Sequence, residues 1–268
     1  MTSDDITIII NTFNSDEQIF SCLDSIDRKF KVQIIENSSN LVFKKKIEDN
    51  YPNVSCELSH DNLGYAKGNN LGLSKVRSKY SLILNPDTKI GKNAIENFFT
   101  AADKYPNFAI IAPAIQEEKD LEKENIRRIE SANNLIEVNN VKGFAMFLNM
   151  EQFADIGFFD DKFFIYFEEI DLCKRLNNLG KKIYLDPSII INHIGGSSHN
   201  QSINFEMELS RNWHWMWSTF YYHKKHYGTS LALSKVIIKF ISAIFKVIIY
   251  SIIFNSKKKK FTFKEHQE

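Results

Sequence analysis

Short apolar runs alternate with amphipathic segments along the first half of the chain. Continuous apolar, β-branched runs are typical of strands buried on both faces. Such a run places a first strand at 6–10, and further strands are predicted at 32–35, 54–58, 80–84 and 108–112. Helical periodicity separates several of them, at 14–26, 63–76 and 91–104. Because strands that alternate with helices form right-handed βαβ units, we expect an α/β fold with a mostly parallel central sheet flanked by helices.

The second half is patterned less regularly. The highly charged segment 117–134 predicts a surface loop or an exposed helix. Beyond it, the apolar pattern indicates four more elements. They are a strand at 141–148, a helix at 168–179, a short strand at 182–185 and an aromatic-rich helix at 205–227.

A long apolar helix is predicted at 231–254, followed by four lysines at 257–260. Three lysines interrupt the helix at spacings that place them on one stripe: Lys235, Lys239 and Lys246. A one-sided basic stripe on an apolar helix is typical of helices that lie in a membrane interface. The alternative is packing on the preceding domain or on a second subunit in a homodimer, with the lysines in water.

Composition sets the broad class of the protein. A length of 268 residues, 43% of them hydrophobic, suits one large domain with an appendage, and we divide the chain into 1–228 and 229–268. The net charge of +1 disfavours a dedicated nucleic-acid binder. The three cysteines form no CxxC pair and the acidic start resembles no signal peptide. We therefore expect a reducing, cytoplasmic setting.

Polar clusters follow four of the predicted elements, at 11–14, 36–39, 62–72 and 85–87. In open parallel sheets, ligands bind beyond the carboxyl ends of the strands, so these clusters should meet at one rim. Each cluster alone is also explained by ordinary turn chemistry. Asp87 could cap a turn, or it could hold a hard divalent cation whose other ligands are diphosphate oxygens and water.

Two further sites carry candidate chemistry. Glu168, Glu169 and Asp171 open a predicted helix after a strongly aromatic run. Their carboxylates could simply complement the helix dipole, or aromatic surroundings could raise their pKa as a general base requires. His193 lies at a predicted strand end beside a Gly-Gly-Ser-Ser segment, where it is either structural or a ligand of phosphate or metal.

These segments together resemble the inverting family-2 glycosyltransferases of GT-A fold, in particular the bacterial rhamnosyltransferase-like branch. The matching pieces, spread over roughly residues 6–225, are 8–14, 35–39, 62–72, 84–87, 143–146, 164–173 and 193–197. Singly they are weak, but their order is specific. The resemblance implies transfer of a sugar from a nucleotide-diphosphate donor to a glycan or lipid-linked glycan, at the inner face of the cell membrane.

The resemblance also implies residue roles at the donor. Thr12, Asn14 and Glu36 would hold the nucleoside, and Asn70 would lie along the donor. The remaining residues would hold a divalent cation, Mg²⁺ or Mn²⁺, on the diphosphate of the donor. They would be Asp87 on the metal, Asn85 alongside it, and His193 on the metal or the diphosphate.

Glu169 would be the catalytic base, with Glu168 and Asp171 positioning the acceptor or the helix. The family usually has Asp where this chain has Glu36 and Glu169. The alternative is therefore a GT-A protein that binds glycan or nucleotide without turnover. A nucleotidyltransferase would need a Gly-rich basic loop after the first strand, and a dehydrogenase would need GxGxxG; the sequence has neither.

Overall fold

The computed structural model describes residues 1–113, 135–193 and 204–264. The charged segment predicted as a surface loop or helix therefore lies outside the described residues. The chain divides into two compact units, Met1–Arg211 and Asn212–Glu268. The division falls inside a helix, before the boundary at 228 that the sequence suggested.

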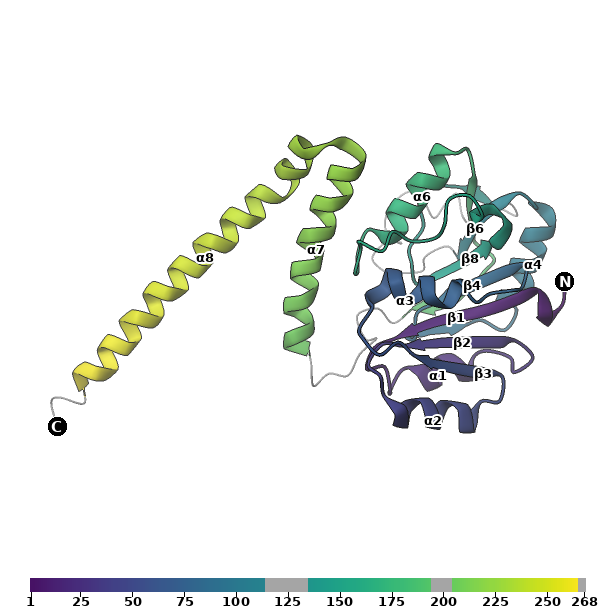
Figure 1. Ribbon diagram of the computed structural model, residues 1–268, viewed down its shortest axis with the longest axis horizontal. Helices are drawn as coiled ribbons and strands as arrows, with labels where there is room; N and C mark the ends of the chain where they lie inside the picture. Colours follow the sequence, from purple (N-terminus) through teal and green to yellow (C-terminus); the bar gives the residue numbers. More distant parts are fainter. Residues whose placement is uncertain (114–134, 194–203, 265–268) are drawn as a thin grey trace. The chain divides into compact units, whose positions relative to one another are not determined.

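The first unit is built on an eight-stranded sheet with the order β3-β2-β1-β4-β8-β6-β9-β7 (Figure 1). Its strands, in chain order, are β1 Ile6–Thr12, β2 Lys31–Glu36, β3 Val54–Leu58, β4 Tyr80–Leu84, β6 Phe108–Pro113, β7 Ile136–Glu137, β8 Ala145–Asn149 and β9 Lys182–Asp186. A separate two-stranded sheet pairs β5 Thr88–Ile90 with β10 Ile191–His193.

The strand order reverses direction at β1. Strands β3, β2, β1 and β4 are parallel neighbours, so their carboxyl ends share one rim. Strand β8 runs antiparallel to both β4 and β6, which makes the complete sheet mixed. The starting end of β8 therefore lies at the same rim as the carboxyl end of β4, where Leu84 pairs with Ala145.

Helices cover both faces of the sheet. The helices of the first unit are α1 Ile19–Asp24, α2 Leu41–Asn50, α3 Gly64–Leu73, α4 Ala94–Lys104 and α6 Glu168–Asn178. Apolar residues of α1, α2 and α4 pack in one core with alternate residues of the strands, including Ile8 and Ile10. Helix α3 packs on the opposite face, against Ile9.

Helix α3 approaches the sheet through its glycines, as their spacing suggested. A Cβ atom at Gly68 would lie 2.5 Å from the Asn11 amide, and one at Gly72 would lie 2.7 Å from Ile9. Because such separations are far below van der Waals contact, only glycine allows this helix–strand distance.

The expected order of elements is confirmed, with two kinds of difference. Helix α1 begins at Ile19, later than the periodicity indicated, because the preceding residues form turns. Helix α2 and the short strands β5 and β7 were not predicted, whereas β10 ends at His193 as expected. The free cysteines Cys22, Cys56 and Cys173 are all buried.

The second unit contains most of α7 Asn204–Tyr227 and all of α8 Thr229–Lys264, joined at Gly228. The backbone of Gly228 has φ = +93°, a conformation that suits glycine at a helix end. Within the described residues, neither these helices nor any other is long and apolar enough to cross a membrane.

Candidate functional site

A cavity opens at the rim where the strand order reverses between β1 and β4. Its walls come from the segments after β1, β2 and β4, from the start of α3, and from the loop before α6. The sequence predicted this convergence of polar clusters. The residues that line the cavity include Thr12, Phe13, Asn37, Asn62, Asn85 and Arg211.

Two asparagines fix one wall of the cavity. The side-chain amide of Asn11 donates to the carbonyl oxygens of Gly64 and Tyr65, at 2.9 and 3.3 Å. Asn37 donates to Asn11 Oδ1 at 2.5 Å and to Gly64 at 3.3 Å. These bonds hold the left-handed turn at Gly64, where φ is +72°, and so fix the start of α3.

Glu36 does not line the cavity. Its carboxylate accepts from the backbone of Ser38 at 3.0 Å and of Asn40 at 2.9 Å, and from the Ser38 hydroxyl. The side chain is 1% exposed, so it closes its own loop instead of presenting an oxygen to a ligand. Asn14, in a left-handed conformation with φ = +50°, is also absent from the cavity wall, whereas Thr12 lies in it. Thr12 is itself 1% exposed, and its hydroxyl donates to the Ile35 carbonyl at 3.4 Å.

Asp87 and His193 lie side by side. Asp87 Oδ1 is 3.3 Å from His193 Nε2, and the Asp87 side chain is almost completely buried. The antiparallel register of β5 with β10 causes this contact, because it pairs Thr88 with His193. The imidazole stacks on the Phe144 ring, with centroids 4.7 Å apart and planes 6° from parallel.

This pair fits a divalent cation. Asp87 Oδ1 is buried, and its 3.3 Å contact with His193 Nε2 lacks hydrogen-bond geometry, so this oxygen can still bind a ligand. The described residues contain no cluster of three or more His, Cys, Asp or Glu side chains that could hold a metal. A Mg²⁺ or Mn²⁺ site here would therefore draw its other ligands from diphosphate oxygens and water, as such ions commonly do.

Glu168, which is buried, and Glu169, which is half-buried, place two carboxylates at the start of α6. Each has one oxygen, Oε2, that is buried and without a hydrogen bond among the described residues. Burial raises the pKa of Glu168 well above its ordinary value, and the charge of Glu169 raises it further. Burial also raises the pKa of Glu169. The aromatic surroundings led us to expect this direction.

The backbone before the pair is held in an uncommon conformation. Tyr166 and Phe167 have φ of +72° and +68°, and Phe167 is the N-cap of α6. Non-glycine residues in this region usually cost of order 1–3 kcal/mol each and collect at functional sites. The adjacent loop is fixed to α3, because Tyr65 donates its backbone N–H to the Phe164 carbonyl at 2.6 Å.

The segment Gly143–Phe144 connects the two groups. The Tyr65 hydroxyl donates to the Gly143 carbonyl at 2.5 Å, and a Cβ at Gly143 would lie 3.8 Å from Glu169 Cβ. The next residue, Phe144, carries the stacked His193 ring. Glu169 and the Asp87–His193 pair are therefore linked through two consecutive residues just before β8, since Glu169 adjoins Gly143 and His193 stacks on Phe144.

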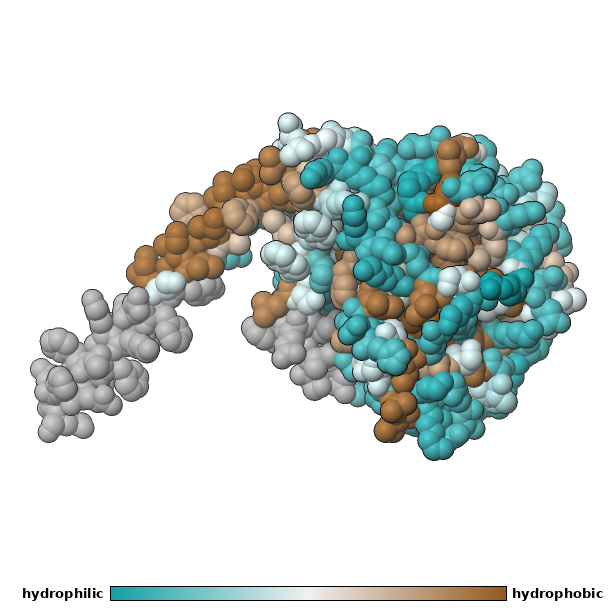
Figure 2. All heavy atoms as spheres, in the orientation of Figure 1, coloured by the Kyte–Doolittle hydropathy of each residue, from teal (hydrophilic) through white to brown (hydrophobic). Residues whose placement is uncertain are grey.

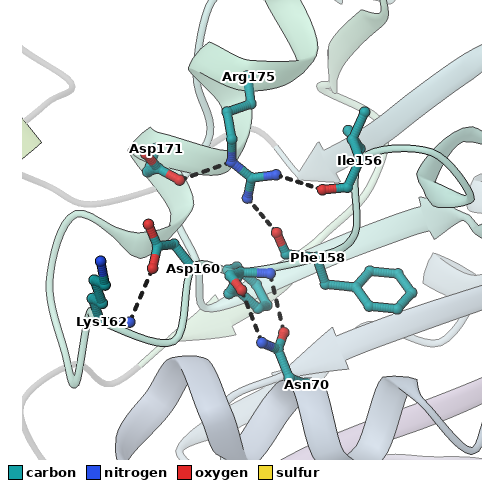
Figure 3. A network of polar contacts seen from close by, with 8 residues as sticks. Asn70, Ile156, Phe158, Asp160, Lys162, Asp171 and Arg175 are labelled. Atoms are coloured by element: carbon teal, nitrogen blue, oxygen red, sulfur yellow. Dashed lines mark hydrogen bonds and ion pairs between the residues drawn. The ribbon is translucent and has the colours of Figure 1, made fainter. Parts of the chain in front are cut away.

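Asp171 and Asn70 support the site without lining the cavity (Figure 3). Asp171 is fully buried and accepts from Arg175 Nε at 2.9 Å. Arg175 also donates to the carbonyls of Ile156 and Phe158. Asn70 exchanges two hydrogen bonds with the backbone of Phe159, at 2.8 and 3.0 Å. Both therefore anchor the loop before α6, and Asn70 takes this position instead of the implied one along the donor.

Sequence reasoning missed several residues of the site. Tyr65, Phe144 and Gly143 lie in segments that had been singled out, but no pattern marked them individually. Arg175 could have been found, because it lies four residues after Asp171 on a helix. The structure leaves undescribed the Gly-Gly-Ser-Ser segment beside His193.

The fold and the site together define an α/β domain of GT-A type, with its polar site at the strand-order reversal. The model of a family described as "Glycosyl transferase family 2" matches residues 7–173. The chain belongs to this family.

Relatives and solved structures agree with this assignment. A low-salt glycan biosynthesis hexosyltransferase, Agl10, of Haloferax volcanii is 29% identical over 196 residues, covering 64% of this chain and 61% of the relative. An N-acetylglucosaminyl-diphospho-decaprenol L-rhamnosyltransferase of Mycobacterium tuberculosis is 20% identical over 207 residues, covering 62% of this chain and 67% of the relative. The chain thus spans about three fifths of the haloarchaeal relative's length.

The fold is also that of a mannosyltransferase from Pyrobaculum calidifontis, solved with GDP-Man and Mn²⁺. The two structures superpose with a TM-score of 0.63 and 13% sequence identity, over 87% of this chain and 67% of the mannosyltransferase chain. GalNAc-T7, solved with UDP, GalNAc and Mn²⁺, has a TM-score of 0.58 at 13% identity, over 70% of this chain and 43% of that one. The predicted GT-A fold is confirmed.

Proposed function

We propose that this chain is an inverting, metal-dependent glycosyltransferase that moves a sugar from a nucleotide-diphosphate donor to a glycan or lipid-linked glycan in surface polysaccharide synthesis. One observation carries the proposal. Two carboxylates of raised pKa at the start of α6 and an aspartate–histidine pair suited to a cation come together around Gly143 and Phe144, because Glu169 adjoins Gly143 and His193 stacks on Phe144.

In this proposal Asp87 and His193 hold the cation and Thr12 contacts the nucleoside. Asn85 and Arg211, which line the cavity with Thr12, face the donor, whereas Asp87 and His193 lie outside the cavity lining. A bound divalent cation would neutralise charge on the departing diphosphate. Arg211 adds positive charge to this wall, which suits an anionic donor.

Glu169 is the base. Its carboxylate takes the proton of an acceptor hydroxyl while that oxygen attacks the anomeric carbon. The bond from this carbon to the diphosphate oxygen breaks on the opposite face, and the electron pair leaves with the nucleoside diphosphate. A single displacement inverts the anomeric configuration. Burial raises the pKa of Glu169, which makes it a stronger base than an exposed glutamate.

Glu168 is proposed to carry the proton of the pair. It is 5% exposed and lies beside the charge of Glu169, so it is the first of the two to be neutralised. This leaves Glu169 ionised, as its role requires. Two carboxylates in contact seldom ionise together in a buried setting.

The donor sugar and location complete the proposal. Rhamnose is the first donor sugar to test, because one relative is named as an L-rhamnosyltransferase. The proposed location is the inner face of the cell membrane, where a lipid-linked acceptor would be reached.

The experiment is an assay of the purified chain with Mn²⁺ or Mg²⁺ against a panel of nucleotide sugars. We expect release of nucleoside diphosphate from at least one donor, and its loss in excess chelator. Tight donor binding without release from any donor, even with candidate acceptors, would favour the alternative of a binding module without turnover.

A further inference from the structure

Helix α8 exposes twelve large apolar side chains between Leu231 and Ile252. Their exposed fractions run from 40% at Leu231 to 76% at Ile238. Figure 2 shows this apolar surface as a continuous brown band along the helix. An exposed apolar surface of this extent usually marks an interaction site.

The twelve residues occupy one side of the helix. At 100° per residue, all of them fall within an arc of about 200°, here named the apolar arc. Lys235, Lys239 and Lys246 fall in the narrow sector outside it. The helix is therefore divided into a wide apolar side and a narrow basic side.

Helix α7 contacts the basic side. Lys239 Nζ lies 3.3 Å from the centre of the Trp215 ring, and Ala232, which lies on this side of the helix, is fully buried. Helices that pack on protein usually turn their apolar side to the partner. Helix α8 instead turns its basic side to α7. We therefore expect its apolar side, which faces away from α7, to contact another apolar environment.

The charge of α8 indicates whether lipid or a second copy of the chain covers the apolar arc. The segment 229–264 contains eight lysines and no Asp or Glu. Pairing two copies would bring these lysines together without any acidic partner on either helix. An anionic lipid surface would instead supply the missing counter-charges, including those for Lys257–Lys260. The arc is also wider than the narrow seam of a two-helix coiled coil.

We propose that the apolar arc of α8 lies in the interface of an anionic lipid bilayer, with the helix parallel to the membrane plane. Lys235, Lys239 and Lys246 then face the headgroups and water, on the same side as α7. An orientation across the bilayer would place a lysine near its centre, which is unfavourable. The proposal concerns binding alone and holds whether or not the chain transfers sugars.

The test uses the full chain with two vesicle compositions, phosphatidylcholine alone and phosphatidylcholine with phosphatidylglycerol. Ile248→Glu places a charge near the middle of the arc, and Ser242→Glu places the same charge beside the lysines. We expect the wild type to sediment with anionic vesicles. Ile248→Glu should weaken this binding at least about tenfold, because an isoleucine no longer inserts. Ser242→Glu should weaken it by no more than about fivefold, because only charge is changed.

A second variant, Ile244→Gln, removes apolar contact without adding charge and should also weaken binding several-fold. Helix content, measured by circular dichroism, should be unchanged in all variants, since these positions are exposed. Equal binding by Ile248→Glu and Ser242→Glu, or no binding by the wild type, would overturn the proposal. A dimer in lipid-free buffer that Ile248→Glu dissociates, without vesicle binding, would assign the arc to a second copy.

Discussion

Replacing Glu169 with glutamine is the sharpest test of the proposed chemistry. Glutamine keeps the shape of the side chain and removes its basicity. A positioned general base usually contributes ~10² to 10⁴ in rate, which corresponds to about 2.7–5.4 kcal/mol of barrier at 1.36 kcal/mol per tenfold change. The upper part of this range is expected, because burial raises the pKa of Glu169 and so makes it a stronger base.

The assay is single-turnover release of nucleoside diphosphate, with donor affinity measured separately by calorimetry. Glu169→Gln should bind the donor normally and lose turnover. The matched control is Glu168→Gln, which resembles a protonated Glu168 and should keep most of the rate. Glu169→Asp should have a mild effect, since aspartate is usual in the family. Near-normal turnover in Glu169→Gln together with an inactive Glu168→Gln or Asp171→Asn would refute the assignment.

Three further predictions follow from the same contacts. Asp87→Ala should weaken donor binding in Mn²⁺, as measured by calorimetry. Excess chelator should weaken donor binding by the wild type to the same extent. Full activity in excess chelator would remove the metal from the mechanism. Burial raises the pKa of Glu168 in the folded protein. The protonated Glu168 side chain therefore contributes its full stability below the ordinary glutamate pKa of ~4.3, and this contribution is lost as pH rises through the folded-state pKa. Glu168→Gln should therefore raise the melting temperature at pH 8 but not near pH 4, and an equal change at both would contradict this. Arg175→Met removes the guanidinium that donates to the buried Asp171 carboxylate and should cost ~3–5 kcal/mol in urea unfolding. The double variant with Asp171→Leu should cost less, and an additive double variant would show that the pair is not coupled.

Local patterns in the sequence determined the framework of the fold. The predicted strand bounds at β3 and β4 matched the observed ones, and the mostly apolar run of β4 is buried on both faces, as such a run indicates. The glycine stripe of α3 was understood correctly as a surface for close packing. Glu168 and Glu169 were recognised because acidic residues that begin a helix after an aromatic run stand out in the sequence.

The tertiary structure alone decided which polar groups are available to a ligand. Asp87 meets His193 through the register of two strands, β5 and β10, that are too short to show any periodicity. Glu36 and Asn70 match the family's motifs, yet their hydrogen bonds hold nearby loops. A sequence shows which side chains could donate or accept, but long-range packing determines which of them already have partners. For the same reason, only the structure showed that α8 turns its basic side toward α7 and leaves its apolar side exposed.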